Sequence, residues 1–160
     1  YPRELADLAG RARIAVGENW ADQFRQTPLV VPLDKSLAIK DRFFRLALGA
    51  FAKAEGAPAL ELSLQASQLS GDLFLEYGKA ILASQRPKGL KGSDRDGYEE
   101  ALKARARPYF ERSMDWYAGA LERIEKEGGS PELAAPIRKR LGTAQVLLQS
   151  DTAAKGDKAE

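Results

Sequence analysis

The sequence predicts an all-α fold of about five or six helices, and three observations support this. Alanine, leucine, arginine and glutamate dominate while valine and isoleucine are sparse, which favours helix over strand. Apolar residues recur at helical spacing in several long segments, and clusters of glycine, proline and serine separate these segments. One short strand-like stretch, residues 29–31, lies between two prolines and is expected to be an extended linker.

Three helices are expected before the clearest break in the chain. The first spans about residues 2–26, and Gly17 is expected to bend or split it. The second begins after Asp34, a good N-cap residue, and ends near Ala54. The third spans about residues 58–84 and carries two apolar stripes, so it is expected to have neighbours on two sides.

Residues 85–97 combine glycine, proline and serine with charges and predict a loop. A long fourth helix, about residues 94–126, overlaps its end and would extend up to roughly 50 Å at 1.5 Å per residue. Pro108 lies inside this helix, where we expect a kink or a restart.

The strongest stop and start signal follows the fourth helix. Gly128 and Gly129 are expected to end it, and Ser130 is expected to cap the next helix, which spans about residues 131–149. Residues 1–150 are therefore expected to form one helical domain. Residues 151–160 are small and charged, and we expect them to form a disordered tail.

The composition excludes much of enzyme chemistry. The chain has no cysteine and no histidine, so thiol nucleophiles, disulfides, catalytic triads and sites of thiolate or imidazole metal ligands cannot form. Asp72 and Glu76, one helical turn apart beside aromatic residues, come nearest to a catalytic carboxylate pair, but surface pairing is the favoured interpretation. We therefore expect a protein that is not an enzyme and has no cofactor, metal site or catalytic residue.

A small–large–small pattern occurs twice with the same spacing. Its members are Ala47, Phe51 and Ala54, then Ala106, Phe110 and Ser113. Such a face lets a neighbouring helix approach closely while the ring fills the gap between the helices. The pattern resembles the second helix of a tetratricopeptide repeat (TPR), and the stripe of Gly71, Phe74 and Gly78 resembles the first helix. This resemblance implies a TPR-like stack of antiparallel helices, while small–large packing in a plain helix bundle is the alternative.

A longer resemblance covers residues 32 to about 126. Residues 32–37, 82–90, 98–102 and 106–113 are similar to the C-terminal region of a group of proteobacterial TPR proteins, which includes gliding-motility envelope components. The resemblance implies a non-catalytic scaffold of the periplasm or the outer-membrane face, with the cytoplasm as the alternative. The chain begins at Tyr1 with no signal peptide, so we expect it to belong to a longer protein. No apolar stretch approaches the roughly 20 residues that cross a bilayer.

The expected function is to bind a peptide or helix of a partner protein, in an envelope complex, on the helical surface. Arg86, Tyr98, Tyr109 and Trp116 are the candidate partner-binding residues. For Arg86 a structural role is the favoured interpretation, since it can bond the last carbonyls of the preceding helix. The net charge of +2 is too even for a protein held to nucleic acid mainly by phosphate contacts.

The alternative is a module that binds anionic partners, nucleic acid or acidic lipid, through a basic cluster. The cluster comprises Arg86, Lys88, Lys91, Arg95, Lys103, Arg105, Arg107 and Arg112. Acidic residues are interleaved with it and largely neutralise it, so a solvated surface is the favoured interpretation.

Overall fold

The structure is a computed structural model that describes residues 2–157, with side chains described for residues 2–150. Within residues 2–157 the chain forms helices and connecting segments without a strand, which confirms the all-α class. The helices are α1 (Pro2–Gln26), α2 (Leu33–Ala54), α3 (Leu60–Leu82), α4 (Gly92–Glu127) and α5 (Pro131–Asp157). None of the described helices is long and apolar enough to cross a membrane.

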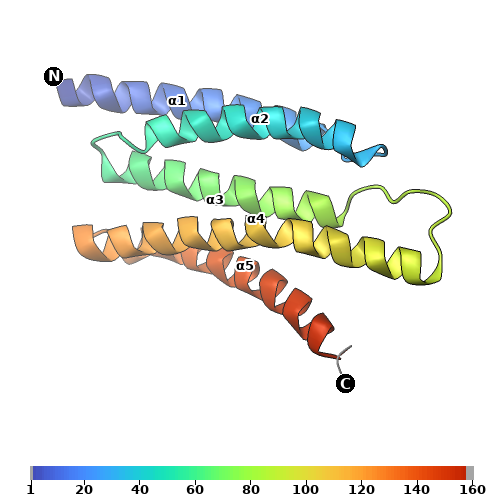
Figure 1. The fold of residues 1–160 in the computed structure, drawn as a ribbon. Coiled ribbons are helices and arrows are strands. Elements are labelled where there is room, and N and C mark those ends of the chain that lie inside the picture. The colour runs from blue at the N-terminus through green and yellow to red at the C-terminus, as the bar shows by residue number, and fades with distance from the viewer. Residues whose placement is uncertain (1, 158–160) are drawn as a thin grey trace.

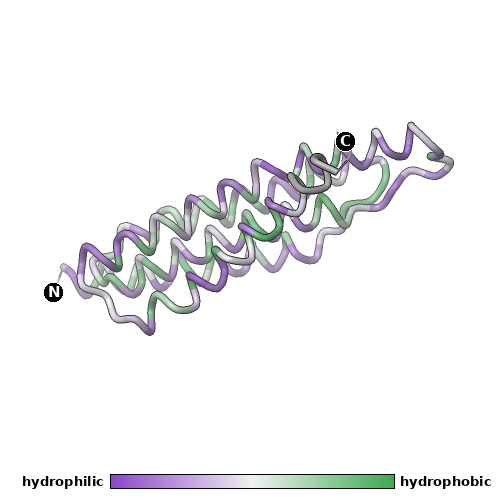
Figure 2. The backbone as a smooth tube through the Cα atoms, turned by 90° about the horizontal axis from the view of Figure 1, so that it is seen from below, coloured by the Kyte–Doolittle hydropathy of each residue, from purple (hydrophilic) through white to green (hydrophobic). Residues whose placement is uncertain are grey.

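The helices follow one another in chain order, each antiparallel to the one before (Figure 1). The molecule is elongated along their common direction (Figure 2). Helix α3 lies at the centre, because it packs against α2 and α4 and also contacts α1 and α5. This position agrees with the two apolar stripes of its sequence and buries residues around most of its circumference.

In each of two helix hairpins, α1–α2 and α3–α4, a glycine of the first helix packs closely against an aromatic ring of the second. A Cβ atom on Gly17 would lie 2.5 Å from Cε1 of Phe51, and one on Gly78 would lie 2.6 Å from Cε1 of Phe110. Phe51 and Phe110 are the central rings of the repeated small–large–small pattern, so both copies of the pattern have the same kind of partner. Helix α1 continues through Gly17, so the expected split does not occur: Gly17 provides close packing instead.

The start of α2 differs from the prediction. The helix begins at Leu33 with Pro32 as its N-cap, and Asp34 lies exposed in the first turn. Ser36 makes the local hydrogen bonds instead: its Oγ accepts from the Val30 N–H at 3.1 Å and donates to the Val30 carbonyl at 2.7 Å. Because the helix begins before Asp34, that residue lies within the first turn, and the Lys35 N–H donates to the Pro32 carbonyl at 3.2 Å.

The linker before α2 is extended and carries no assigned strand, as predicted. It is tied to the loop that follows α3, because the Gln85 N–H donates to the Leu29 carbonyl at 2.9 Å. The Val31 N–H in turn donates to Oε1 of Gln85 at 2.9 Å. The two loops at this end of the molecule therefore hold each other.

Helix α4 runs without interruption through Pro108, so the expected restart does not occur. Pro108 and Ala104, one turn earlier, are both exposed. The Ala104 carbonyl that loses its helical donor can therefore bond water, which limits the cost of the proline. Helix α4 ends as predicted, with Gly128 in the left-handed region (φ 74°) and the Gly129 N–H donating to the Ile124 carbonyl at 2.9 Å.

Helix α5 begins at Pro131, as predicted, but its backbone continues to Asp157, beyond the expected end at residue 149. The expected tail, residues 151–160, thus starts as helical backbone, and residues 158–160 lie outside the described residues.

Candidate functional site

A groove runs between α2 and α4 with α3 as its floor. Both helices are antiparallel to α3, so they run parallel to each other, and side chains make the contacts between them. The rings of Phe44 and Tyr109 lie 6.1 Å apart between centroids, and Arg105 pairs with Asp34 at 4.0 Å. Three cavities, of about 450, 330 and 290 Å³, follow one another along this line. We call it the α2–α4 groove, bounded by residues 31–55 on one side and 87–123 on the other.

The first cavity, about 450 Å³, lies where the two loops meet the starts of α2 and α4. Pro32, Pro87 and Leu102 contribute apolar surface to it. Tyr98 is half-buried in its lining, and the Oη atom is buried without a hydrogen-bond partner among the described residues. A buried hydroxyl without a partner costs free energy, so the Tyr98 Oη does not stabilise the fold where it lies.

The middle cavity, about 330 Å³, is lined by two tyrosines whose rings are in close contact. The ring of Tyr109 on α4 lies 4.3 Å from the ring of Tyr77 on α3, between centroids. Burial raises the pKa of both phenols, so they stay protonated hydrogen-bond donors at neutral pH. Tyr77 donates to Asp41 on α2 at 3.4 Å, which links the floor to the α2 side.

The third cavity, about 290 Å³, contains Trp116 beside the end of α2. Glu55 also lines it, and its Oε1 atom is buried without a hydrogen-bond partner among the described residues. Burial raises the pKa of Glu55, and the charge of nearby Arg123 opposes that rise. The Arg123 guanidinium donates instead to Ser63 Oγ at 2.7 Å, so this buried oxygen of Glu55 has no donor among the described residues.

The two walls of the groove differ in their predominant charge, although Arg45 on α2 pairs with Asp41 at 2.7 Å and Asp115 on α4 lines the third cavity. Asp34, Asp41 and Glu55 lie at multiples of seven residues, which places them on one face of α2. The α4 wall alternates basic and aromatic residues at helical spacing: Arg105, Tyr109, Arg112, Trp116 and Arg123. An occupant of the groove would therefore meet mainly carboxylates on one side and mainly guanidinium groups and rings on the other.

Three of the four predicted partner-binding residues, Tyr98, Tyr109 and Trp116, lie along this one groove. Arg86 lines none of the three cavities. Its Nε and Nη2 donate to the two carboxylate oxygens of Glu99 at 2.8 and 2.9 Å, and its Nη1 donates to the Ser84 carbonyl. These bonds lower the pKa of Glu99 and fix the loop to α4.

Members of the basic cluster of the alternative prediction line different cavities. Arg105 and Arg112 line the groove, whereas Lys103 lines a separate cavity that includes Leu147 of α5. Lys103 also pairs with Glu100 at 3.7 Å, and the Arg112 guanidinium lies 5.9 Å from the centroid of the Phe74 ring. Several of these cations are therefore already engaged within the protein.

The carboxylates of Asp72 and Glu76 join helices. Asp72 accepts a hydrogen bond from Tyr117 on α4 and pairs with Arg140 on α5 at 2.9 Å, and Glu76 pairs with Arg25 on α1 at 3.0 Å. Among the described side chains, no group of three or more histidine, cysteine, aspartate or glutamate residues could hold a metal ion.

Comparison of the chain with protein-family models, with curated proteins and with solved structures gives no match. The resemblance to TPR proteins of the cell envelope therefore stays a prediction from the sequence.

Proposed function

We propose that this protein is a non-catalytic interaction scaffold that binds a segment of a partner protein in the α2–α4 groove. The observation that carries the proposal is the alignment of Tyr98, Tyr109 and Trp116 with three successive cavities between two walls of mainly opposite charge. Half-buried aromatic side chains next to arginines are the residues that most often supply binding energy at protein interfaces.

The length of the groove favours a chain segment over a small molecule. From Tyr98 to Arg123 the α4 wall extends for about 38 Å at 1.5 Å per residue. An extended segment of about 11 residues, or a helix of about 25, would cover that distance. Small ligands bind in single pockets that enclose most of their surface, whereas these cavities form an open row.

The chemistry of the walls defines the partner. Acidic side chains of the segment would face Arg105, Arg112 and Arg123, and basic side chains or backbone amides would face the carboxylates of α2. Apolar side chains between them would pack on Trp116 and Tyr109.

The finer architecture and the location belong to the same proposal. We place the chain among TPR-like helical stacks because two hairpins repeat the same glycine–aromatic contact and α3 contacts both α1 and α5. The periplasm or the outer-membrane face is the proposed location, with the cytoplasm as the alternative, on the sequence resemblance alone.

The experiment selects peptides from displayed libraries of extended and helical segments with the purified chain. Selected peptides are then measured against Arg112→Glu and Trp116→Ala in the groove, and against Lys79→Glu on the exposed side of α3 as a matched charge reversal. The proposal predicts at least a tenfold loss of affinity for the two groove variants and none for Lys79→Glu. Equal affinities for all variants would contradict it.

Salt-dependent binding tests the anionic alternative. The chain is mixed with a random DNA duplex and with acidic vesicles at about 50 mM salt, where phosphate-driven binding is strong. The scaffold proposal predicts no retention, because the arginines of α4 face an acidic wall. Retention that Arg112→Glu abolishes would favour the anionic module instead.

A further inference from the structure

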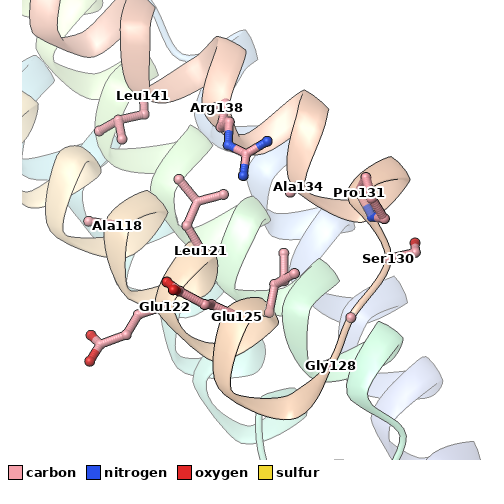
Figure 3. A pocket seen from close by; sticks show the side chains of 12 residues that line it. Ala118, Leu121, Glu122, Glu125, Gly128, Ser130, Pro131, Ala134, Arg138 and Leu141 are labelled. Atoms are coloured by element: carbon pink, nitrogen blue, oxygen red, sulfur yellow. The ribbon is translucent and has the colours of Figure 1, made fainter.

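A second open surface lies at the opposite side of α4, in the seam with α5. A cavity of about 710 Å³ opens there beside the turn that joins the two helices. Figure 3 shows Leu121 of α4 and Leu141 of α5 between the helices, and Arg138 of α5 directing its guanidinium group into the seam. We call this surface the α4–α5 seam, defined by Leu121, Glu125, Ala134, Arg138 and Leu141.

The walls of the seam carry opposite charges that are not used within the chain. Glu125 on α4 and Arg138 on α5 are both exposed, and neither pairs with another described side chain. Nearby charged residues on the same helices are paired: Glu122 pairs with Lys126 at 2.8 Å, and Arg140 pairs with Asp72 at 2.9 Å. The seam thus keeps one free carboxylate and one free guanidinium group on facing helices.

The floor of the seam is apolar. Leu121 and Leu141 are half-buried, and Ala134 is buried between α4 and α5. A helix laid in the seam would cover the remaining apolar surface of the two leucines, which favours association. The charges at the rim would mainly fix orientation and partner choice.

We propose that the α4–α5 seam is a self-association surface in which a second copy of this chain docks about a two-fold axis. The axis would place α4 of each copy against α5 of the other, so that Glu125 of one copy faces Arg138 of its partner and the same pair forms twice. A surface with an acidic and a basic wall is complementary to itself under this symmetry, which is the commonest symmetry of soluble oligomers. The groove on the other side of α4 stays open in this dimer.

Charge exchange tests the pairing. The mass of the wild-type chain, of Glu125→Arg and of Arg138→Glu is measured by sedimentation and light scattering between about 1 and 200 µM at low salt. The wild type should dimerise with concentration, and each single variant should weaken the dimer at least tenfold, because like charges then face each other twice. An equimolar mixture of the two variants should restore dimers, because each reversed charge then faces its opposite.

Lys139→Glu is the matched control, since it reverses the neighbouring charge on α5 at a position about 100° around the helix. It should leave dimerisation unchanged, and circular dichroism should show that all variants stay folded. A wild-type chain that is monomeric throughout the range, or a mixture that stays monomeric, overturns the proposal. So does a dimer that both single variants retain.

Discussion

The ammonium group of Lys40 on α2 closes the C-terminal end of α1 by donating to the backbone carbonyl of Phe24 at 2.5 Å. It also donates to the Thr27 carbonyl at 2.9 Å and lies 3.9 Å from the centroid of the Phe24 ring. The side chain is only 4% exposed, and burial lowers the pKa of Lys40 to about 8. A cation at the C-terminus of a helix complements the free carbonyls there.

This lowered pKa predicts a rise of stability with pH. The pKa of lysine in the unfolded chain is about 10.4, so between pH 8 and 10 the unfolded chain binds more protons than the folded protein. The free energy of unfolding should therefore increase over this window, by at most about 1.4 kcal/mol per pH unit for one proton. Above about pH 10 it should fall, because the raised pKa values of Tyr77 and Tyr117 keep protons on the folded protein.

Urea unfolding at several pH values, for the wild type and for Lys40→Met, measures this effect. The variant should lose the rise between pH 8 and 10, and at pH 7 it should be less stable by about 1–3 kcal/mol because two carbonyls lose their donor. An identical pH profile for the two proteins would show that Lys40 is not the group responsible.

Gly78→Ala should destabilise the α3–α4 hairpin. The added Cβ would lie 2.6 Å from the Phe110 ring in a closely packed core, where overpacking costs about 1–3 kcal/mol and exceeds the gain in helix propensity. Gly49→Ala, at an exposed position of α2, is the control, because no atom lies within 4 Å of its Cβ position. This substitution should raise the free energy of unfolding by about 0.5–1 kcal/mol. Thermal unfolding of both variants checks the opposite signs, and two equal shifts would contradict the packing account.

Arg86→Ala should loosen the loop between α3 and α4. The paired bonds to Glu99 and the bond to the Ser84 carbonyl would be lost, while global stability should fall by only about 1 kcal/mol because the pair is partly exposed. Limited trypsin digestion should then cut faster after Lys88 and Lys91 than in the wild type. Arg95→Ala serves as the control, and equal cutting rates in all three proteins would rule out the anchoring role of Arg86.

Tyr98→Phe tests the role of the buried hydroxyl. The buried Oη has no partner among the described residues, so its removal should leave the protein as stable as the wild type or more stable by up to about 1 kcal/mol. Affinity for a groove-binding peptide should change little, because the aromatic ring is kept and the buried hydroxyl is not exposed to the groove. A clear loss of stability would show that the Tyr98 hydroxyl has a hydrogen-bond partner in the folded protein.

Local signals in the sequence predict most of the helices and turns. Gly128, Gly129 and Pro131 end one helix and start the next because their backbone preferences act within a few residues. Asp34 is predicted to cap α2, but the helix begins one residue before it, at Leu33, where Ser36 holds the linker against the first turn, and this depends on the path of the chain. Similarly, Pro108 is tolerated because the turn around it is exposed, which sequence alone does not reveal.

The groove depends on the packing of α2 and α4 around α3, which the sequence does not predict. Tyr98, Tyr109 and Trp116 were found by residue type, but their alignment follows from α2 and α4 lying on the two sides of α3. The heptad spacing of Asp34, Asp41 and Glu55 was the available signal for the acidic wall. On an isolated helix such a row cannot be distinguished from a solvated face. Only the fold shows that α4 lies opposite these carboxylates.

Chemical-shift mapping of the chain with a selected peptide tests the central claim most directly. The account predicts that the backbone amides that shift lie along residues 34–55 and 98–123, on both walls of the α2–α4 groove, together with the Trp116 indole. Shifts confined to the exposed sides of α1, α3 and α5, with the groove unchanged, would contradict it.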